Sequence, residues 1–279
     1  SSVVMFGVGI PLYYSIPFGI FIGVLSGFLI VELSSHVITF HRGYDLYNVG
    51  FAGGILAFAY FSIFKLLDIE YTTNLIYTND QHLLLLYLYI AIHLLLIIVG
   101  VILNDKPLKE YFMITKLSGR AVTDFTRKSN QPLTMFNIGV TGLAALVVLL
   151  ILNVHMNGPV FGGLMTIVGF SAFGKHPRNV LPPMIGVLLV TLIFSIPLSV
   201  PVVLAIIFST ALAPIAGEHG FIIGVLSGML HLPIVTSLGQ LHGGVLLYSN
   251  GFAAAFTAVI FITVIHTFER SRNNGATRV

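Results

Sequence analysis

The sequence contains no cysteine and no tryptophan, and few of its residues carry a charge. The lack of cysteine excludes disulfide bonds and thiolate metal sites. Only 8% of the 279 residues are Asp, Glu, Lys or Arg, whereas a soluble domain carries about 25%. With 56% hydrophobic residues and a mean hydropathy of +0.98, most of the surface cannot face water. The composition therefore predicts an all-α polytopic membrane protein whose main partner is the lipid bilayer.

The positive charges are gathered in two polar segments. Residues 104–134 hold six Lys or Arg against three acids, and the tail 269–279 holds three arginines. Basic segments beside membrane spans set orientation more often than they bind a polyanion, so we expect no nucleic-acid partner. The positive-inside rule places both segments in the cytoplasm and the acidic loop 68–80 outside. This predicts a multi-pass protein of the cell inner (plasma) membrane with a cytoplasmic C-terminus.

Several of the apolar stretches are shorter than the roughly 20 residues that a full crossing needs. The helix candidates are residues 3–16, 18–34, 49–66, 82–103, 135–154, 159–173, 180–196, 199–215, 218–238 and 250–268. Short segments interrupted by Gly or Pro are typical of re-entrant helices, whose irregular backbone is tolerated where it is buried in protein or lines a cavity. We expect about 8–10 apolar segments, some of them short or re-entrant.

An internal repeat relates the two ends of the chain. Residues 19–54 align without a gap to residues 220–255, with 15 of 36 positions identical, including the Gly-Phe-Ala at 50–52 and 251–253. The helix after the first copy leads to the acidic loop, and the helix after the second leads to the basic tail. The copies therefore cross in opposite senses, which predicts an inverted-topology repeat of the kind that secondary transporters use.

The repeat and the polar segments divide the chain into four parts. These are a first membrane repeat (1–103), a cytoplasmic basic linker (104–134), a second membrane repeat (135–268) and a basic cytoplasmic tail (269–279). Segments that precede the motif in the second half have no counterpart before the first copy. We therefore expect the first repeat to be N-terminally incomplete.

Three stretches carry a family resemblance: HRGYDLYNVGFAGG (41–54), GFSAFGKHPRNVLPP (169–183) and GEHGFIIGVLSGMLH (217–231). With their LYxxGFA and GKHPRN words, they resemble an uncharacterised family of bacterial integral-membrane proteins, known as a domain of unknown function. The similarity covers nearly the whole chain, and it implies no established activity.

A looser likeness is to urea transporters. The stretches MFNIGVTGLAA (135–145) and LYNVGFAGGILA (46–57) are similar in style to the turn that opens a helix in each inverted half of those proteins. The resemblance implies two inverted halves around a shared path. The chain departs from the urea-transporter pattern because neither half has a clear Asn-Pro-x-Ser-Gly element, so the likeness does not assign urea as the solute.

Both copies of the repeat place polar side chains around a Gly-rich turn, and the GEHG segment adds a carboxylate and an imidazole. We expect these side chains to line the path of a small polar solute: His41, Tyr47, Asn48, His242, Tyr248, Asn250, Glu218 and His219. Helix N-termini at such a turn offer free N–H groups to an anion or a carbonyl oxygen. Two alternatives stay open, in which the histidines tie their own loop backbone together and the Gly-Phe-Ala residues serve helix packing.

Other charges occur at breaks between apolar runs. Lys175, His176 and Arg178 in GKHPRN could attract an anion at a pore mouth, or could form an inside loop against lipid headgroups. Arg42 and Asp45 occur only in the first copy, where they could pair locally or lie in a solvated turn. Their asymmetry argues against a role at a strictly symmetric site.

An enzymatic function has weaker support in the sequence. Glu218, His219, His231 and His242 could supply nitrogen and oxygen ligands to a metal, but their spacing matches no local zinc motif. Neither a GxSxG nucleophile elbow nor an HExxH motif occurs. We expect no cofactor and no catalytic residue.

The sequence thus predicts a small-solute channel or secondary transporter, with its path at the interface of two inverted repeats and a urea-like solute, ammonium or a small anion as substrate. The alternatives are an intramembrane metal-dependent enzyme and a membrane sensor or assembly subunit. Gly/Ala-rich helix faces also make a homo-oligomer an expectation.

Overall fold

The computed structural model describes residues 11–68, 77–121, 123–238 and 246–276, with side chains described only between 249 and 271 in the last of these ranges. These residues form helices and loops and contain no strand. Within them, seven helices are long and apolar enough to cross a membrane, and two shorter apolar helices accompany them. The chain is therefore an all-α polytopic membrane protein, as its composition predicts.

The helices follow the apolar stretches closely, apart from those at the N-terminus and in the centre. Their bounds are α2 Leu12–His41, α3 Asn48–Leu66, α4 His82–Ile102, η1 Leu108–Glu110, α5 Tyr111–Ile114, α6 Phe125–Lys128, α7 Gln131–Ile151, α8 Gly158–Phe170, α9 Pro177–Ile193, α10 Val200–Phe208, η2 Ser209–Leu212, α11 Ala213–His219, α12 Phe221–Leu238 and α13 Leu246–Ala276. The predicted break between helices 3–16 and 18–34 is wrong, while residues 3–10 lie outside the described residues. One helix, α2, runs through Pro17, which a membrane helix tolerates.

Helices α10, η2 and α11 form the buried centre of the structure. Nearly all residues from Val202 to Ala216 are buried, so this segment faces protein on every side. The α-helix tightens to a 3-10 turn at η2 because Pro214 has no N–H to donate to the carbonyl of Thr210. The sequence predicted one continuous helix over 199–215, whereas the structure has an interrupted one.

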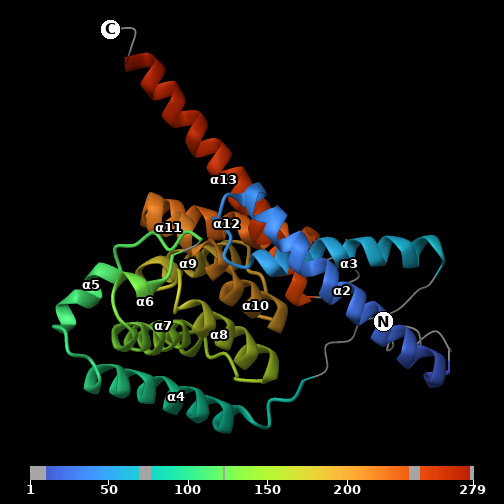
Figure 1. Cartoon of the computed structure of the whole chain (residues 1–279), viewed down its shortest axis with the longest axis horizontal. Helices are drawn as coiled ribbons and strands as arrows, with labels where there is room; N and C mark the ends of the chain where they lie inside the picture. The colour runs from blue at the N-terminus through green and yellow to red at the C-terminus, as the bar shows by residue number, and fades with distance from the viewer. Residues whose placement is uncertain (1–10, 69–76, 122, 239–245, 277–279) are drawn as a thin grey trace.

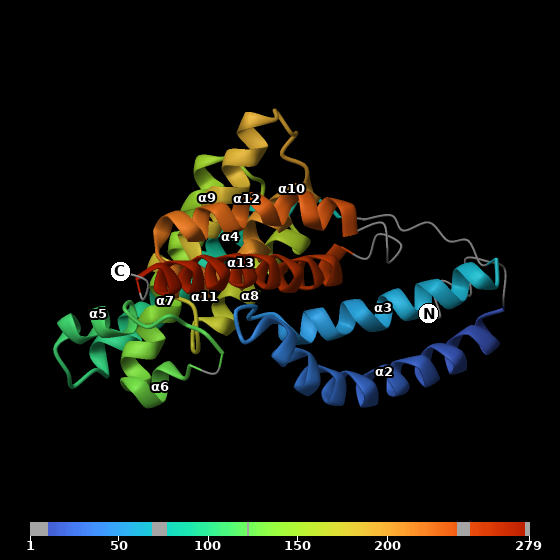
Figure 2. The same ribbon diagram turned by 90° about the horizontal axis from the view of Figure 1, so that it is seen from above.

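Most of the remaining helices pack around this centre, and the hairpin of α2 and α3 extends from it (Figure 1). Helix α4 packs on α7, and α9 packs on α12. Helices α2 and α3 form a hairpin that extends away from the other helices, and α13 crosses its base (Figures 1 and 2). Large apolar side chains on α2, α3 and α4 are exposed, among them Phe28, Leu66 and Ile102. Such surfaces suit lipid contact.

Candidate functional site

Three interruptions of helical structure meet beside the buried centre. They are the loop 42–47 between α2 and α3, the loop 171–176 between α8 and α9, and η2. The Leu46 N–H donates to the Ala211 carbonyl at 3.0 Å, which joins the first loop to η2. Irregular backbone at such a place needs polar partners that a lipid environment cannot supply. The three segments obtain these partners from one another and from the polar side chains between them.

The side chain of Lys175 lies at the centre of this junction and is completely buried. Its Nζ donates to the Tyr47 hydroxyl at 2.5 Å and to Thr210 Oγ1 at 2.8 Å. The same ammonium lies 4.1 Å from the centroid of the Tyr47 ring, and the Phe170 ring is also close, at 5.2 Å. Both hydroxyls and both rings can stabilise a cation in a site without water.

Asp45 is the second buried charged group of the junction. Its Oδ1 accepts the Tyr47 N–H at 2.8 Å, which fixes the start of α3. Its Oδ2 is buried and has no hydrogen-bonding partner among the described residues. A buried carboxylate oxygen without a donor is costly, because desolvation is not compensated. Asp45 is therefore held in place through one oxygen, while the other stays available to a proton or a ligand.

Burial shifts the pKa of both groups toward their neutral forms. It raises the pKa of the Asp45 carboxyl to about 8, and the Tyr47 N–H and the nearby Lys175 oppose this shift. Burial lowers the pKa of Lys175 well below its ordinary value, which the charge of Asp45 partly offsets. Each group thus favours the charged form of the other.

Asp45 and Lys175 are the only Asp, Glu, Lys or Arg side chains that are buried in the part of the chain that the structure describes. Charged side chains within a membrane protein are expensive and usually mark ion, proton or substrate pathways. All other described charged groups lie at least partly in contact with solvent or lipid. Because both buried charged groups lie at one junction, we take the Asp45–Lys175 pair, with Tyr47 and Thr210, as the candidate functional site.

His41 supports the site without facing it. Its Nδ1 accepts the Asp45 N–H at 3.2 Å, so Nε2 carries the proton and donates to Asn48 Oδ1 at 2.9 Å. The Asn48 amide in turn donates to the Ser34 carbonyl at 2.6 Å. The imidazole therefore ties α2, the loop and α3 together, which is the loop-fixing alternative from the sequence. Asn48 serves the same network.

Asn137 of α7 holds the second loop in position. Its amide nitrogen donates to the carbonyls of Ser171 and Lys175, at 2.7 and 2.8 Å, and its Oδ1 accepts the Tyr111 hydroxyl at 3.2 Å. At the end of the same loop, Asn179 donates to the Gly174 carbonyl at 2.8 Å. These bonds fix the backbone that aims Lys175 inward.

The basic linker covers one side of the junction. The Ala121 N–H donates to the Gly43 carbonyl at 3.1 Å, and the Phe125 N–H donates to the Ala172 carbonyl at 3.2 Å. Gly119 and Gly174 both have positive φ, and a Cβ on Gly119 would collide with the Gly174 carbonyl oxygen. The linker therefore packs tightly against both loops and separates Lys175 from that surface.

A rim cluster lies beside the linker and consists of Arg120, Glu218 and His219, which are at least partly exposed, and of Tyr44, which is buried. The Tyr44 hydroxyl donates to Glu218 Oε1 at 2.5 Å, and Arg120 Nη1 lies 3.6 Å from the same oxygen. The guanidinium also stacks over the Tyr44 ring at 4.3 Å, and His219 stacks on its ring. Glu218 and His219, both predicted as path-lining, thus belong to the surface of the junction.

The predicted cationic cluster at GKHPRN is corrected by the structure. Lys175 and His176 are buried and only Arg178 is exposed, so the three do not form one positive surface. His176 Nε2 bonds to the Leu117 carbonyl at 2.9 Å, and burial lowers the pKa of the imidazole to about 4, so it is neutral. The suggested local pair is also absent, because Arg42 reaches His266 Nδ1 at 3.1 Å while Asp45 turns inward.

The two Gly-Phe-Ala motifs meet each other at the crossing of α3 and α13. Cβ atoms built on Gly50 and Gly251 would each contact the backbone of the other glycine. The rings of Phe51 and Phe252, which correspond in the repeat, lie 5.5 Å apart. Both phenylalanines are buried, which agrees with the packing alternative for these residues.

The second copy of the motif is only partly described. His242 and the side chain of Tyr248 lie outside the described residues. Asn250 is buried, and its Oδ1 lies 3.4 Å from Nε2 of His231, which joins α12 to α13. No three His, Asp or Glu side chains within the described ranges gather as metal ligands would. Glu218, His219 and His231 therefore do not form the ligand group that the metal alternative required.

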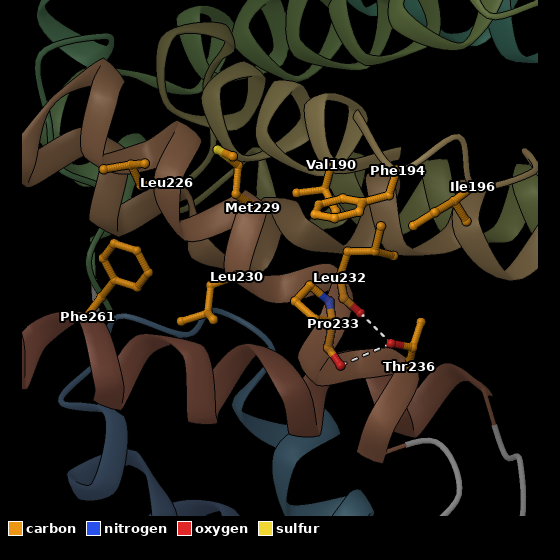
Figure 3. Close-up of a pocket in the computed structure, with 10 residues that line it drawn as sticks. All are labelled: Val190, Phe194, Ile196, Leu226, Met229, Leu230, Leu232, Pro233, Thr236 and Phe261. Carbon is orange, nitrogen blue, oxygen red and sulfur yellow. Dashed lines mark hydrogen bonds between the residues drawn. The ribbon is translucent and has the colours of Figure 1, made fainter. Parts of the chain in front are cut away.

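An apolar cavity of about 770 Å³ lies apart from this junction, between α9, α12 and α13 (Figure 3). Its lining residues are Val190, Phe194, Ile196, Leu226, Met229, Leu230, Leu232, Pro233, Thr236 and Phe261. The Thr236 hydroxyl is the one polar side-chain group among them, and it bonds to the Leu232 and Pro233 carbonyls. The cavity therefore offers no side-chain group to a polar solute.

The comparisons with known proteins give one result. Neither the curated proteins nor the solved structures include a match to this chain. A family model described as "Protein of unknown function (DUF1576)" matches residues 1–66 and 103–267, which hold both copies of the repeat and the whole Asp45–Lys175 junction. The matched ranges leave out α4. The chain belongs to the DUF1576 family of proteins of unknown function.

Proposed function

We propose that this protein is a secondary transporter of a small polar solute and that the solute passes the junction of Lys175, Tyr47 and Thr210. The observation that carries the proposal is the completely buried lysine, held by two hydroxyls where two interhelical loops meet the interrupted helix at η2. Interrupted helices around a buried polar centre are how secondary transporters build their substrate sites.

The chemistry of the junction favours a small anion over urea or ammonium. The groups that point inward include the Lys175 ammonium and the hydroxyls of Tyr47 and Thr210. The Thr210 hydroxyl already donates to the Ile207 carbonyl, which leaves the ammonium and the Tyr47 hydroxyl as possible donors to a solute. Helix α3 also begins at this point without a side-chain cap, so its dipole adds positive potential. An ammonium ion would meet repulsion from Lys175, and an anion would meet attraction.

The repeat supports an inverted architecture around this point. Corresponding residues of the two copies, Gly50 with Gly251 and Phe51 with Phe252, contact each other. From this contact α3 and α13 lead in different directions (Figures 1 and 2). An inverted repeat related by an axis through the Gly50–Gly251 contact accounts for both facts. In this arrangement the basic linker and the C-terminal tail face the cytoplasm of a plasma-membrane protein.

Burial of the junction favours alternating access over an open channel. The side chains of Lys175 and Thr210 are not accessible from any surface, and the linker covers one side. A solute can reach them only when the surrounding elements move. Such movement is the working cycle of a transporter.

The test is solute flux into proteoliposomes that contain the full chain, with urea, ammonium, formate, glycerol, nitrate and thiocyanate as the panel. We expect flux of a small anion, and we expect Lys175→Met protein to lose it. Lys109→Met is the matched control, because Lys109 is exposed on η1. Absence of flux for every solute, or equal flux in wild type and Lys175→Met, would reject the proposal.

A further inference from the structure

We propose that the Asp45 carboxyl group is the proton-binding site of this protein, and that Lys175 couples the binding of one proton there to the binding of one small monovalent anion. This proposal rests on the transport function proposed above and specifies its energy source. It assigns proton coupling to a pair of residues that the sequence places in short breaks between apolar runs.

The two oxygens of the Asp45 carboxylate have different surroundings. One carboxylate oxygen is used by the Tyr47 N–H, and the other is buried with no partner among the described residues. A proton on Oδ2 removes the charge that makes this position costly. The carboxyl of Glu218, by comparison, has two partners and a side chain that is 35% exposed.

The hydrogen bonds of Lys175 leave its ammonium free to change counter-ion. Its ammonium bonds to two hydroxyls and not to the Asp45 carboxylate, so the two charges are neighbours without being locked together. The Lys175 ammonium can therefore have either of two counter-ions, the Asp45 carboxylate or a bound anion. Exchange between these two partners links protonation to anion binding.

The coupled step balances in charge and atoms. In the loaded state Asp45 Oδ2 carries the proton, Lys175 is an ammonium, and the anion is its counter-ion. On release, the O–H bond of Asp45 breaks, the proton passes to water, the anion leaves, and the new carboxylate neutralises Lys175. One proton and one anion move together, and no electron is transferred. Both states are electroneutral, which a water-poor site requires.

Other titratable groups around Asp45 are accounted for by their contacts. The groups that face it or its loop come from several elements. They are His41 from α2, Arg42, Tyr44 and Tyr47 from the loop itself, Lys175 from the second loop, His266 of α13 through Arg42, and, through Tyr44, Arg120 of the linker, Glu218 and His219 of α11 and Glu269 of α13. His41 accepts the Asp45 N–H and donates to Asn48, so its proton position is already set. Lys175 is the one cation whose charge directly opposes protonation of Asp45.

The first test is infrared spectroscopy of the full chain in lipid nanodiscs, titrated from acidic to alkaline pH. We expect a protonated-carboxyl C=O band that disappears with a midpoint near 8, the pKa to which burial raises Asp45. The band should be absent in Asp45→Asn and unchanged in Asp105→Asn, which alters an exposed carboxylate. A band that persists in Asp45→Asn, or no band above pH 6, would overturn the assignment.

Variants of Lys175 test the sign of its effect on the titration midpoint of Asp45. Because its positive charge lowers the pKa of Asp45, Lys175→Met should move the midpoint to higher pH, whereas Lys175→Arg should leave it nearly unchanged. A midpoint that falls in Lys175→Met would contradict the coupling. If Asp45→Asn does not fold, Asp45→Glu serves instead, and a shifted rather than abolished band is expected.

The second test measures proton movement with the solutes of the flux panel. Proteoliposomes loaded with a pH-sensitive dye should acidify inside as thiocyanate or nitrate enters, with about one proton per anion, and Asp45→Asn should remove this acidification. Flux without acidification would reject the coupling and leave the transport function standing. A titrating Asp45 band without any flux would reject the transport function and leave the proton site standing.

Discussion

The junction contains two groups of similar composition, and their surroundings separate their roles. Lys175, Asp45 and Tyr47 form a trio that is buried throughout, whereas in the trio of Arg120, Glu218 and Tyr44 only the tyrosine is buried and both charged side chains are partly exposed. Each has a cation, a carboxylate and a tyrosine, and the loop 42–47 contributes to both. Arg120 and Glu218 form a partly exposed ion pair, which contributes little to stability. The buried trio costs free energy in a membrane protein, so we attribute its presence to function.

The two trios should differ most in solute flux when the cation of each is replaced by methionine. Lys175→Met removes the donor of two buried hydrogen bonds, and a bond from a charged group contributes about 1.5–3 kcal/mol, which predicts a roughly 10–100-fold loss of solute flux. Arg120→Met should change flux less than about fivefold, because exposed pairs contribute about 1 kcal/mol or less. Initial rates of uptake in proteoliposomes measure both. Equal losses would show that burial does not distinguish the two trios.

The tyrosines offer a finer comparison, since both lie in one loop and both become phenylalanine. Tyr47→Phe removes the hydroxyl that Lys175 and Thr210 share, and a neutral buried hydrogen bond contributes about 1 kcal/mol, so a roughly fivefold loss of flux is expected. Tyr44→Phe removes the bond to Glu218 and the bond accepted from Arg120 Nη1, but it leaves the partly exposed Arg120–Glu218 pair in place, so flux should stay within about twofold of wild type. The reverse order of effects would place the path at the rim.

The carboxylates differ in their expected pH dependence. Burial raises the folded-state pKa of Asp45 from 3.8 to about 8, so between these values the folded chain holds a proton that the unfolded chain has lost. The free energy of unfolding therefore falls, through this group, as pH rises across that window, and stays low above it. Asp45→Asn should remove this fall, and its thermal stability relative to wild type should rise from pH 5 to pH 8.

Asp105→Asn is the control for this series, because it removes an exposed carboxylate from the loop between α4 and η1. Thermal unfolding in detergent at several pH values measures all three proteins. A constant difference between Asp45→Asn and wild type across the window would contradict the assigned state of Asp45.

The smallest effect is expected at Glu218. Its side chain is 35% exposed and its ion pair with Arg120 is 3.6 Å long. Glu218→Gln keeps an acceptor for the Tyr44 hydroxyl, so the free energy of unfolding should change by about 1 kcal/mol or less. Flux should be nearly that of wild type. A loss of flux as large as that of Lys175→Met would return the site to the GEHG segment.

Hydropathy predicted most of the helices, because spans such as α4 and α7 are bounded by polar residues on both sides. It did not predict the interruption at η2, which depends on one proline inside an apolar run. It also missed the burial of Asp45 and Lys175. A charged residue in a short break ordinarily lies in water, and only the packing of the linker and of η2 against both loops encloses these two.

The sequence indicated the other residues of the site to different degrees. Tyr47 belongs to the repeated LYxxGFA word, and Asn137 lies in a stretch that resembles a helix-opening turn, so both carried a signal. Thr210 carried none, since a threonine among apolar residues usually bonds its own helix, as its contact with the Ile207 carbonyl shows. Its role follows from Lys175, which approaches it from another part of the chain.

The lack of cysteine permits the most direct test of the central claim, that the solute passes the buried junction. Single cysteines at Thr210 and at Thr257 would be treated with a membrane-impermeant thiol reagent in proteoliposomes. Both positions are completely buried, but Thr210 accepts a hydrogen bond from Lys175 whereas the Thr257 hydroxyl bonds to the Ala253 carbonyl of its own helix, α13. The account predicts that Thr210→Cys reacts during turnover, more slowly when transported solute is in excess, while Thr257→Cys does not react. Equal protection of both cysteines under turnover would contradict a path through the junction.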